Sequence, residues 1–574
     1  MGREDLTEDI METEPRDIAE VADYDTVIPD DVFPVPANDI SYEQSATIIF
    51  DRIAGHHRLF RRGGNVVEVV EEEDGPVIQV VSPARFASMV ETFGNRVCRK
   101  EVQTKTEDGK PSKKKVVWRR TLLTVTSAQV ILASQAAQTH LKEIHQVAQC
   151  PILLRTPDGP KIIHSGFCRR NDGIGIYITN RSTVPTVPLE TAIAAVLSLT
   201  DDLHFKTPAD KSRALAHYIS PAIKMGGWLE ADFPLDMSEA EESQSGKTYR
   251  QKVVAAIYGE TCPLSAGNSR GGLGSLDETV SGLLLAGRPF IQIDNVRGKI
   301  DSPVMEMALR GSGRVQCRAL RVSGSVAVKP FIWQMSSNGA EMTPDIANRS
   351  IITRIKKRAE DQPFKEYAEG DLFKHVVTNQ SFFLGCVFAV VKTWADEMCP
   401  RTTDSRHDFR EWTQSMDWIV QNVLGWREPL LDGHREQQAR ASSARLQWLR
   451  ELGFAVVRDG KKGQFFSASN LADLMDEHGI VMPGATARDS RFPSMAVGRA
   501  LGPLFKAAEG ARVDVDGLSV YRFTRELLTH GSHNKKAFHR YVVQESGDDV
   551  AMDRDSAWEL DGFELSAEAE RVSF

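Results

Sequence analysis

The chain has 574 residues, a length that corresponds to roughly three to four domains. It is 41% hydrophobic and 26% charged, with a formal net charge of −9, and this composition is typical of soluble globular proteins. No apolar run approaches the roughly 20 residues of a membrane span, and the acidic start is unlike a secretory signal, so we expect no membrane partner. The seven cysteines are scattered and form no CxxC pair, which argues against a disulfide framework and a cysteine-rich zinc site and favours a reducing cytoplasm.

The N-terminal part of the chain predicts an acidic tail followed by an α+β domain. The tail over 1–40 is acidic and contains several prolines, a composition expected of a disordered segment. The α+β domain is expected over 41–185. Within it, valine-rich segments at 66–70 and 77–81 predict strands, and 151–163 predicts a hairpin around a Pro-Asp-Gly turn.

A basic stretch at 105–120 has two interpretations. The stretch begins near a Glu-Asp-Gly turn and ends beside Trp118. One interpretation is an exposed, solvated loop, which we favour. The other is contact with nucleic-acid phosphates, which requires clustered cations but no sequence code. The cations concerned are Lys110, Lys113, Lys114, Lys115, Arg119 and Arg120.

A phosphate-binding loop is predicted before a helix-compatible segment at 249–258. Such a loop needs backbone N–H groups at a helix N-terminus, a lysine for the phosphate charge and a hydroxyl for Mg²⁺. Ser245, Gly246, Lys247 and Thr248 supply these groups, which predicts ATP and Mg²⁺ as ligands. The full GxxxxGK[ST] pattern also requires glycine at position 241, where this chain has glutamate.

Two apolar strands are expected to complete the nucleotide site. The strand at 289–294 ends in Asp294, about 45 residues after the P-loop lysine, and its carboxylate is expected to hold Mg²⁺ with Thr248. The strand at 331–338 ends in Asn338, whose amide can orient water against the γ-phosphate. Arg349 follows soon after and can reach the nucleotide of a neighbouring subunit as an arginine finger.

The order of these elements resembles the helicase/ATPase module of phage, plasmid and integrative-element replication proteins. These belong with the superfamily-three, AAA+-related helicases, which often follow primase domains. The resemblance covers about 45–426, and its most specific motifs are Gly287-Arg288-Pro289, Asp294-Asn295-Val296 and Asp345-Ile346-Ala347-Asn348-Arg349. It implies an α/β fold, with a P-loop AAA+-like ATPase core at 186–430.

Some positions depart from the family pattern. No glutamate follows Asp294 directly, so Glu278 is the expected base for water activation. The first arginine of the Asp345–Arg349 box is Asn348, and the second asparagine of the sensor is Gly339. We expect these departures to affect the rate of hydrolysis more than nucleotide binding.

The resemblance also predicts surfaces for DNA. Related helicases place a DNA-tracking hairpin between the Walker B and sensor strands, where a solvated strand face or subunit-interface charge is an equal alternative. The candidate residues there are Arg314, Arg318, Arg321 and Lys329. The segment 431–545 predicts three helices and a hairpin at 513–523, a winged-helix-like domain with Arg499 and Lys506 on its recognition helix. Winged helices also dock proteins. An acidic tail over 546–574 completes the chain.

We therefore predict an ATP-dependent DNA helicase or translocase that acts on single- or double-stranded DNA as a cytoplasmic homo-oligomeric ring, hexameric by the resemblance. A mobile-element or phage-like replication system is the expected setting, with a separate primase or initiation partner because no primase core precedes the ATPase. The alternative is a nucleotide-switched DNA- or protein-binding regulator with weak or no hydrolysis. A third possibility is a defence or regulatory role for the same motor.

Overall fold

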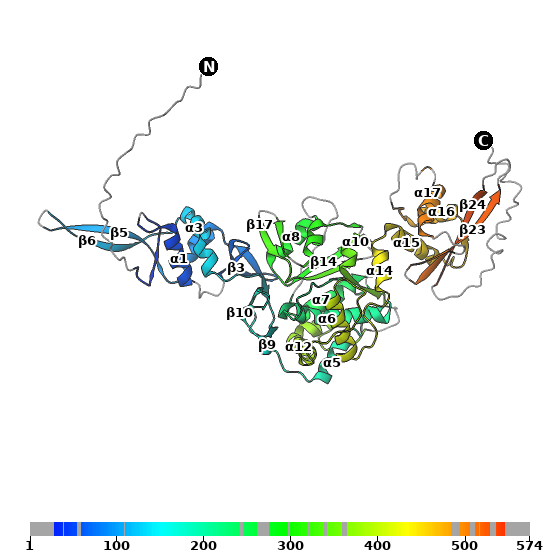
Figure 1. Cartoon of the computed structure of the whole chain (residues 1–574), viewed down its shortest axis with the longest axis horizontal. Helices are drawn as coiled ribbons and strands as arrows, with labels where there is room; N and C mark the ends of the chain where they lie inside the picture. The colour runs from blue at the N-terminus through cyan, green and yellow to red at the C-terminus, as the bar shows by residue number, and fades with distance from the viewer. Residues whose placement is uncertain are drawn as a thin grey trace, which may run out of the picture. The chain divides into compact units, whose positions relative to one another are not determined.

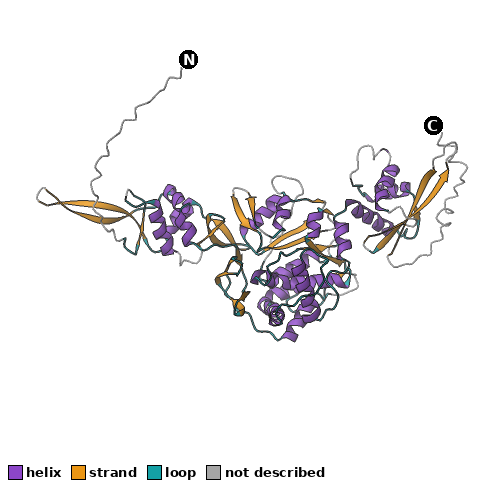
Figure 2. Cartoon of the chain, viewed as in Figure 1, coloured by secondary structure: helices purple, strands orange, loops and turns teal. Residues whose placement is uncertain are grey.

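The computed structural model describes most of the chain between residues 28 and 545. The described residues are 28–37, 39–53, 59–107, 110–240, 245–260, 275–296, 299–311, 313–319, 322–337, 341–358, 364–483, 491, 493–505, 511–515, 517–528 and 535–545. Helices and strands occur throughout, so the fold is mixed α/β (Figure 2). The chain forms two compact units, Met1–Leu59 with Val80–Leu141, and Phe60–Gln79 with Lys142–Phe574. The predicted boundaries near residues 185 and 430 fall inside the second unit and stay predictions.

The first unit combines short helices with a three-stranded sheet of order β1-β5-β6 (Figure 1). Helix α1 buries Ala46, Ile49, Phe50 and Ile53, a spacing that places all four on one helical face. Phe50 stacks on Phe86 of α2, with ring centroids 5.7 Å apart. The elements are β1 (Val32–Pro34), α1 (Tyr42–Ile53), α2 (Pro83–Val90), β5 (Arg96–Glu107), β6 (Lys110–Arg120), α3 (Val125–Leu132) and α4 (Gln135–His140).

The interpretation of 105–120 as a solvated loop is wrong, because this stretch forms most of an antiparallel hairpin. β5 and β6 pair from Cys98↔Arg120 to Glu107↔Lys110. The connection between the strands is Asp-Gly, the dipeptide that most strongly favours a two-residue hairpin turn. The valines and Trp118 near the end of β6 have the strand propensity that the lysine run obscured.

The second unit begins with small sheets, and the predicted strands at 66–70 and 77–81 and the hairpin at 151–163 are confirmed. Their sheets have the orders β2-β3-β4, β10-β11-β7 and β8-β9. Arg62 donates to the carbonyls of Leu284 and Leu285 (2.8 and 2.5 Å), so the first of these sheets is tied to helix α8. The elements are β2 (Leu59–Arg62), β3 (Asn65–Glu72), β4 (Gly75–Val80), β7 (Gln146–Ala148), β8 (Ile152–Thr156), β9 (Gly159–Ile163), β10 (Gly166–Arg169) and β11 (Gly175–Ile178).

A five-stranded sheet of order β12-β20-β13-β18-β14 forms the centre of the second unit. The four strands from β20 to β14 are parallel, and only the edge strand β12 runs antiparallel. Neighbouring residues such as Ile351 and Ile352 belong to different hydrophobic clusters, because successive side chains point to opposite faces. The strands are β12 (His204–Phe205), β13 (Leu235–Glu239), β14 (Phe290–Val296), β18 (Ile332–Ser337) and β20 (Ser350–Lys356).

Helices cover both faces of this sheet, as an almost wholly parallel sheet requires. One cluster includes α5, α6, α7 and α12, and the other includes α8, α9 and α10 (Figure 1). The remaining elements are α5 (Leu189–Ser198), α6 (Pro208–Gly226), α7 (Lys247–Ile257), α8 (Leu276–Ala286), β15 (Lys299–Ile300), α9 (Pro303–Ala308), β16 (Arg314–Ala319), β17 (Val322–Ala327), β19 (Glu341–Met342), α10 (Pro344–Asn348), α11 (Leu372–Thr378), α12 (Gln380–Asp396), α13 (Arg410–Trp418) and η1 (Ile419–Val423). Among the described helices none alone has the length and apolarity of a membrane span; α11 and α12 meet that test only as a pair bent by 86°.

The C-terminal elements have a hydrophobic cluster of their own, which includes Trp448, Leu471 and Val520. The three predicted helices and the hairpin at 513–523 are confirmed. The long strand β24 was not predicted, and it completes a sheet of order β21-β24-β23-β22. The elements are α14 (His434–Ala441), α15 (Ala444–Arg458), β21 (Phe465–Phe466), α16 (Ala468–His478), α17 (Pro493–Leu501), η3 (Gly502–Leu504), β22 (Ala511–Val515), β23 (Leu518–Leu528) and β24 (Lys535–Glu545).

Candidate nucleotide-binding site

The carboxyl ends of β13, β18 and β20 meet at one edge of the central sheet. Glu239, the last residue of β13, pairs in register with Ser337 of β18 and with Arg354 of β20. Ligands of open parallel sheets bind outside this edge. The loop that leads from β13 to α7 starts there; its residues 241–244 lie outside the described residues.

The turn into α7 has the backbone of a phosphate-binding loop. Gly246 caps the helix with φ 90° and ψ 5°, a left-handed conformation that suits glycine, and a Cβ there would lie 3.1 Å from Leu203. The N–H groups of the first turn have no intrahelical acceptor and point toward any anion at this end. Ser245 and Lys247 are buried, and the Ser245 hydroxyl has no hydrogen-bond partner among the described residues. A buried orphan hydroxyl at this turn fits a site that takes a polar ligand.

Three oxygen-bearing side chains meet beside this turn. Thr248 Oγ1 donates to Asp294 Oδ1 at 2.5 Å and lies 3.2 Å from Ser336 Oγ. Ser336 also donates to Asp294 Oδ1. These side chains come from α7, β14 and β18. A hydroxyl and a carboxylate so placed are oxygen ligands of the type that Mg²⁺ takes beside a nucleotide.

A bulge in β14 explains why its acidic residue points to this cluster. The register between β14 and β18 shifts between Ile293 and Val296, and Asn295 has φ 52°. Asparagine tolerates this left-handed conformation better than most residues. The Asn295 N–H then donates to Ser336 Oγ at 2.9 Å. Bulges redirect side chains near functional sites, and this one gives the Asp294-Asn295 pair a structural role.

Two residues of α7 that sequence reasoning did not single out fasten the helix to the sheet. Arg250 is fully buried, forms an ion pair with Asp236 and donates to Ser238 Oγ, both on β13. Gln251 Nε2 donates to the carbonyls of Asp236 and Met335, at 3.0 and 2.8 Å. These contacts hold α7 over β13 and β18 and so position Thr248. The available signal in the sequence was that the polar residues Arg250 and Gln251 come just before an apolar run in this helix.

Arg349 lies at the amino ends of the parallel strands, whereas the P-loop lies at their carboxyl ends. It follows α10, and its carbonyl accepts from the N–H of Leu235 at the start of β13 (2.9 Å). Since β13 spans five residues, its two ends lie about 13 Å apart. The Arg349 side chain forms an ion pair with Asp345 at 3.1 Å. The predicted catalytic base, Glu278, lies in the first turn of α8, and its N–H donates to Ser275 Oγ (3.3 Å); its role stays a prediction.

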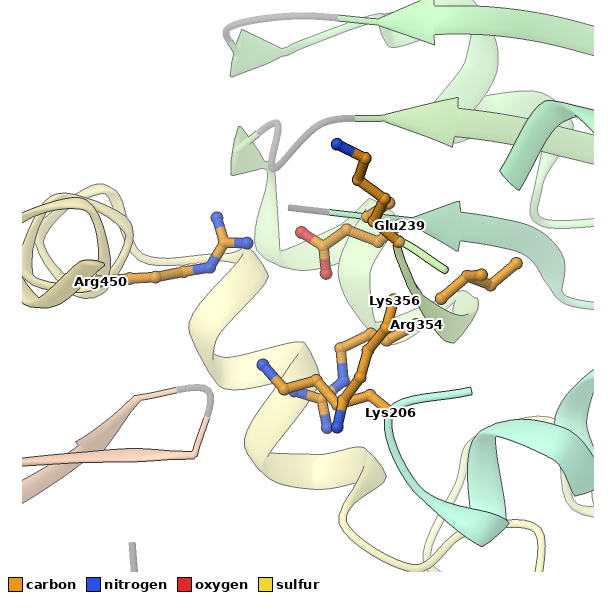
Figure 3. A pocket seen from close by; sticks show the side chains of 8 residues that line it. Lys206, Glu239, Arg354, Lys356 and Arg450 are labelled. Carbon is orange, nitrogen blue, oxygen red and sulfur yellow. The ribbon is translucent and has the colours of Figure 1, made fainter. Parts of the chain in front are cut away.

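A basic pocket of about 230 Å³ opens at the same edge of the sheet as the P-loop (Figure 3). It is lined by Lys206, Arg354, Lys356, Lys357 and Arg450, with Glu239 as its acidic residue and with Ala240 and Ile355. The carboxylate of Glu239 forms a buried ion pair with Arg440 of α14, with Nη1 and Oε1 3.1 Å apart. A concave site with this excess of cations attracts phosphate groups.

The predicted DNA-tracking segment is a hairpin of β16 and β17, paired from Arg314↔Ala327 to Ala319↔Val322. Arg314 donates to the carbonyl of Ser325 at 2.8 Å, while Arg318 is exposed. Lys329 lies beyond the hairpin and forms an ion pair with Asp172 at 3.2 Å.

The other predicted site residues lie apart from this hairpin or beyond what the structure describes. Arg499 is exposed on α17. Arg321, Asn338 and Lys506 lie outside the described residues, so their roles stay predictions. Ser336, two residues before Asn338, is the polar residue of β18 that reaches the Thr248–Asp294 pair.

No protein-family model matches this chain, and no curated protein matches its sequence. Among solved structures the chain is similar to "SCCmec type IV Cch - active helicase", at 10% identity and a TM-score of 0.28, over 85% of this chain and 97% of that one. It is also similar to JCV helicase bound to an acetamide ligand, at 12% identity and a TM-score of 0.20, over 44% of this chain and 71% of the other. Both proteins are helicases. Because both TM-scores are far below 0.5, we draw no conclusion about this chain from either likeness.

Proposed function

We propose that the chain binds Mg-ATP at the carboxyl edge of the central sheet and hydrolyses it as a DNA helicase or translocase. The observation that carries this proposal is the cluster of Thr248, Asp294 and Ser336 directly beside the Gly246 turn. It combines an anion-binding helix N-terminus with oxygen ligands for a hard cation.

Each residue of the cluster has a role in this proposal. Lys247, at the first position of α7, neutralises the charge of the phosphates. Thr248 and Asp294 would hold the metal, which would neutralise charge on the phosphates of the nucleotide. Ser336 orients the Asp294 carboxylate through its hydrogen bond. Arg250 and Gln251 keep the helix N-terminus in place through their hydrogen bonds to β13 and β18.

A ring of subunits is part of the proposal because Arg349 lies too far from its own P-loop to act there. A neighbouring subunit that presents its Arg349 to this P-loop would add a positive charge to the site. The Asp345 ion pair holds the guanidinium close to α10 and limits its rotamers. DNA as the partner, and a mobile-element or phage-like replication system with a separate primase, are the remaining parts of the proposal.

The basic pocket favours a second candidate function, a nucleotide-switched regulator. Arg450 comes from α15, beyond the helices of the central sheet, and lies 5.4 Å from the ring of Phe454. Lys206, which precedes α6, lies over the same ring at 5.8 Å. A phosphate bound here would attract both cations and would thereby change the position of α15 relative to the central sheet. Such a switch requires binding of ATP but not its hydrolysis.

Steady-state ATP hydrolysis with and without single-stranded DNA separates the two functions. The variants are Lys247→Ala and Asp294→Ala, with Lys252→Ala on the same helix and Asp301→Ala as matched controls. DNA-stimulated turnover that both site variants abolish and both controls retain supports the motor. If wild type binds ATP but turns over no faster than the site variants, the motor is excluded in favour of the switch.

A further inference from the structure

One hairpin of this acidic chain is rich in cations. Residues 96–120, which form β5 and β6 and which we name the basic ribbon, hold ten Lys and Arg against three Asp and Glu, a net charge of +7 in a chain of −9. The P-loop site uses none of these residues. Arg96, Lys100 and Arg119 form ion pairs with Asp31, Asp39 and Glu101, and the ribbon keeps a positive excess beyond these pairs.

The basic ribbon extends well beyond the sheet that supports it. β5 and β6 have 12 and 11 residues, whereas β1 pairs only with Arg96–Cys98 at the start of β5. The rest of the ribbon pairs only with itself among the described strands, and it projects from the helices of the first unit (Figure 1). A hairpin of two strands is marginally stable without a hydrophobic face to pack. This geometry is that of an arm.

The register distributes the cations over both faces of the ribbon. At the base, Arg99 pairs with Arg119, and Arg120 on the other face pairs with Cys98; all three arginines are exposed. A ribbon meant to pack on a protein core would have one apolar face. Cations on both faces suit a partner with negative charge on both sides.

We propose that the basic ribbon inserts into the major groove of double-stranded DNA and contacts phosphates on both of its walls. The major groove of B-DNA, about 12 Å wide, admits a two-stranded β-ribbon and carries a phosphate backbone along each edge. The major groove of A-form RNA is too narrow for side chains to enter. Contacts made by lysines to phosphates give affinity without sequence preference. Binding of the ribbon to duplex DNA does not require ATP, so this inference goes beyond the proposed ATPase activity.

The experiment measures binding of the full chain to a 30-base-pair DNA of arbitrary sequence, by fluorescence anisotropy over a range of salt concentrations. The variant is the triple substitution Lys113→Gln, Lys114→Gln and Lys115→Gln. A second triple, Lys161→Gln, Lys374→Gln and Lys462→Gln, removes the same charge from exposed positions elsewhere. Thermal melting checks that each variant is folded, and ATP hydrolysis without DNA checks that the nucleotide site is intact.

For the ribbon triple we expect at least about tenfold weaker duplex binding at low salt, and a log–log salt slope less negative by about 2 to 3, since each phosphate contact contributes about 0.9. The control triple should keep both the affinity and the slope. Equal losses for the two triples, or no loss for the ribbon triple, would overturn the proposal. So would an equal loss with double-stranded RNA, because the ribbon would then contact polyanions without using the groove.

Dimethyl sulfate protection provides a second measurement that does not depend on affinity. The reagent methylates guanine N7, which faces the major groove. Wild type should protect N7 positions. Helix α17 is a separate candidate for groove contact, so Arg499→Gln should keep the part of this protection that the ribbon provides. Absence of N7 protection in wild type at saturating protein would contradict insertion of the ribbon.

Discussion

Thr248 and Asp294 are joined by a hydrogen bond of 2.5 Å although 46 residues separate them in the chain. Their elements are α7 and β14, and the strand that precedes α7, β13, is not a neighbour of β14 in the sheet. The strand between them is β18, which supplies Ser336 to the same pair. The site therefore combines three segments of the chain. The strands concerned follow one another as β13, β14 and β18 in the sequence but lie in the order β13-β18-β14 in the sheet.

The Thr248–Asp294 pair predicts that the effect of Mg²⁺ on nucleotide binding needs the Asp294 carboxylate. Asp294→Asn keeps the shape of the side chain but removes the charge that a divalent cation requires. We expect ATP binding in the variant to lose its dependence on Mg²⁺, and turnover to fall at least about 100-fold. Titration of ATP with and without Mg²⁺ checks this. Asp301→Asn is the control, and a variant that still responds fully to Mg²⁺ would exclude Asp294 as a ligand.

The buried ion pair between Arg250 and Asp236 predicts a stability effect. Arg250→Met leaves the buried Asp236 carboxylate without its charge partner, which costs about 3–5 kcal/mol in comparable pairs. Denaturant unfolding measures the loss. Adding Asp236→Asn to the variant should recover part of the stability, because no charge then remains uncompensated. A single variant as stable as wild type would contradict the role of the pair.

Glu260 predicts a dependence of stability on pH. Burial raises the pKa of Glu260 from 4.5 to about 7, and the N–H of Gln149 and the charge of Arg288 offset only part of that rise. The folded chain then binds the proton more tightly than the unfolded chain. This contribution to the free energy of unfolding is complete below pH 4.5 and is lost as pH rises to 7, by about 3 kcal/mol.

Glu260→Gln isolates this effect, because its amide does not titrate. Unfolding of wild type and variant at a series of pH values should give a difference that grows in favour of the variant between pH 4.5 and 7. Glu436→Gln, on α14, is the control. A difference that does not change over this interval would contradict the buried, titrating carboxyl group.

The place of Arg349 predicts complementation between inactive subunits. Arg349→Ala and Lys247→Ala should each abolish hydrolysis. Mixed, they should regain part of the activity, because a Lys247→Ala subunit still offers Arg349 to a neighbour with an intact P-loop. A mixture of Lys247→Ala and Asp294→Ala should stay inactive, since both changes affect the same site. Failure of the first mixture to recover any activity would contradict action between subunits.

The basic pocket predicts that Arg450 contributes to the affinity for nucleotide. Loss of one hydrogen bond to a charged group corresponds to about tenfold in the dissociation constant, so Arg450→Ala should weaken ATP binding by about that factor. Arg458→Ala, an exposed arginine at the end of the same helix, should have no effect. Binding of a fluorescent ATP analogue measures both. Equal affinity in the two variants would place the nucleotide away from this pocket.

Local sequence patterns predicted many of the elements, because their signals lie within a few residues. The apolar strand before Asp294 and the helix after Gly246 follow from hydrophobic runs and from glycine at a helix start. The same local approach misinterpreted 105–120, where the lysine run masked a strand. It also gave no prediction for β24, whose pairing with β23 involves a segment far along the chain.

The sequence by itself determined which residue types are available to a nucleotide site, among them Lys247, Thr248 and Asp294. Only the tertiary structure decided that Ser336 contacts the last two, that Arg250 and Gln251 hold α7 on the sheet, and that Arg349 lies at the opposite edge. Strand order, register and the bulge at Asn295 are set by packing between segments distant in sequence, and no local pattern encodes such packing. Residue identity therefore predicts the chemistry, and non-local pairing determines which groups meet.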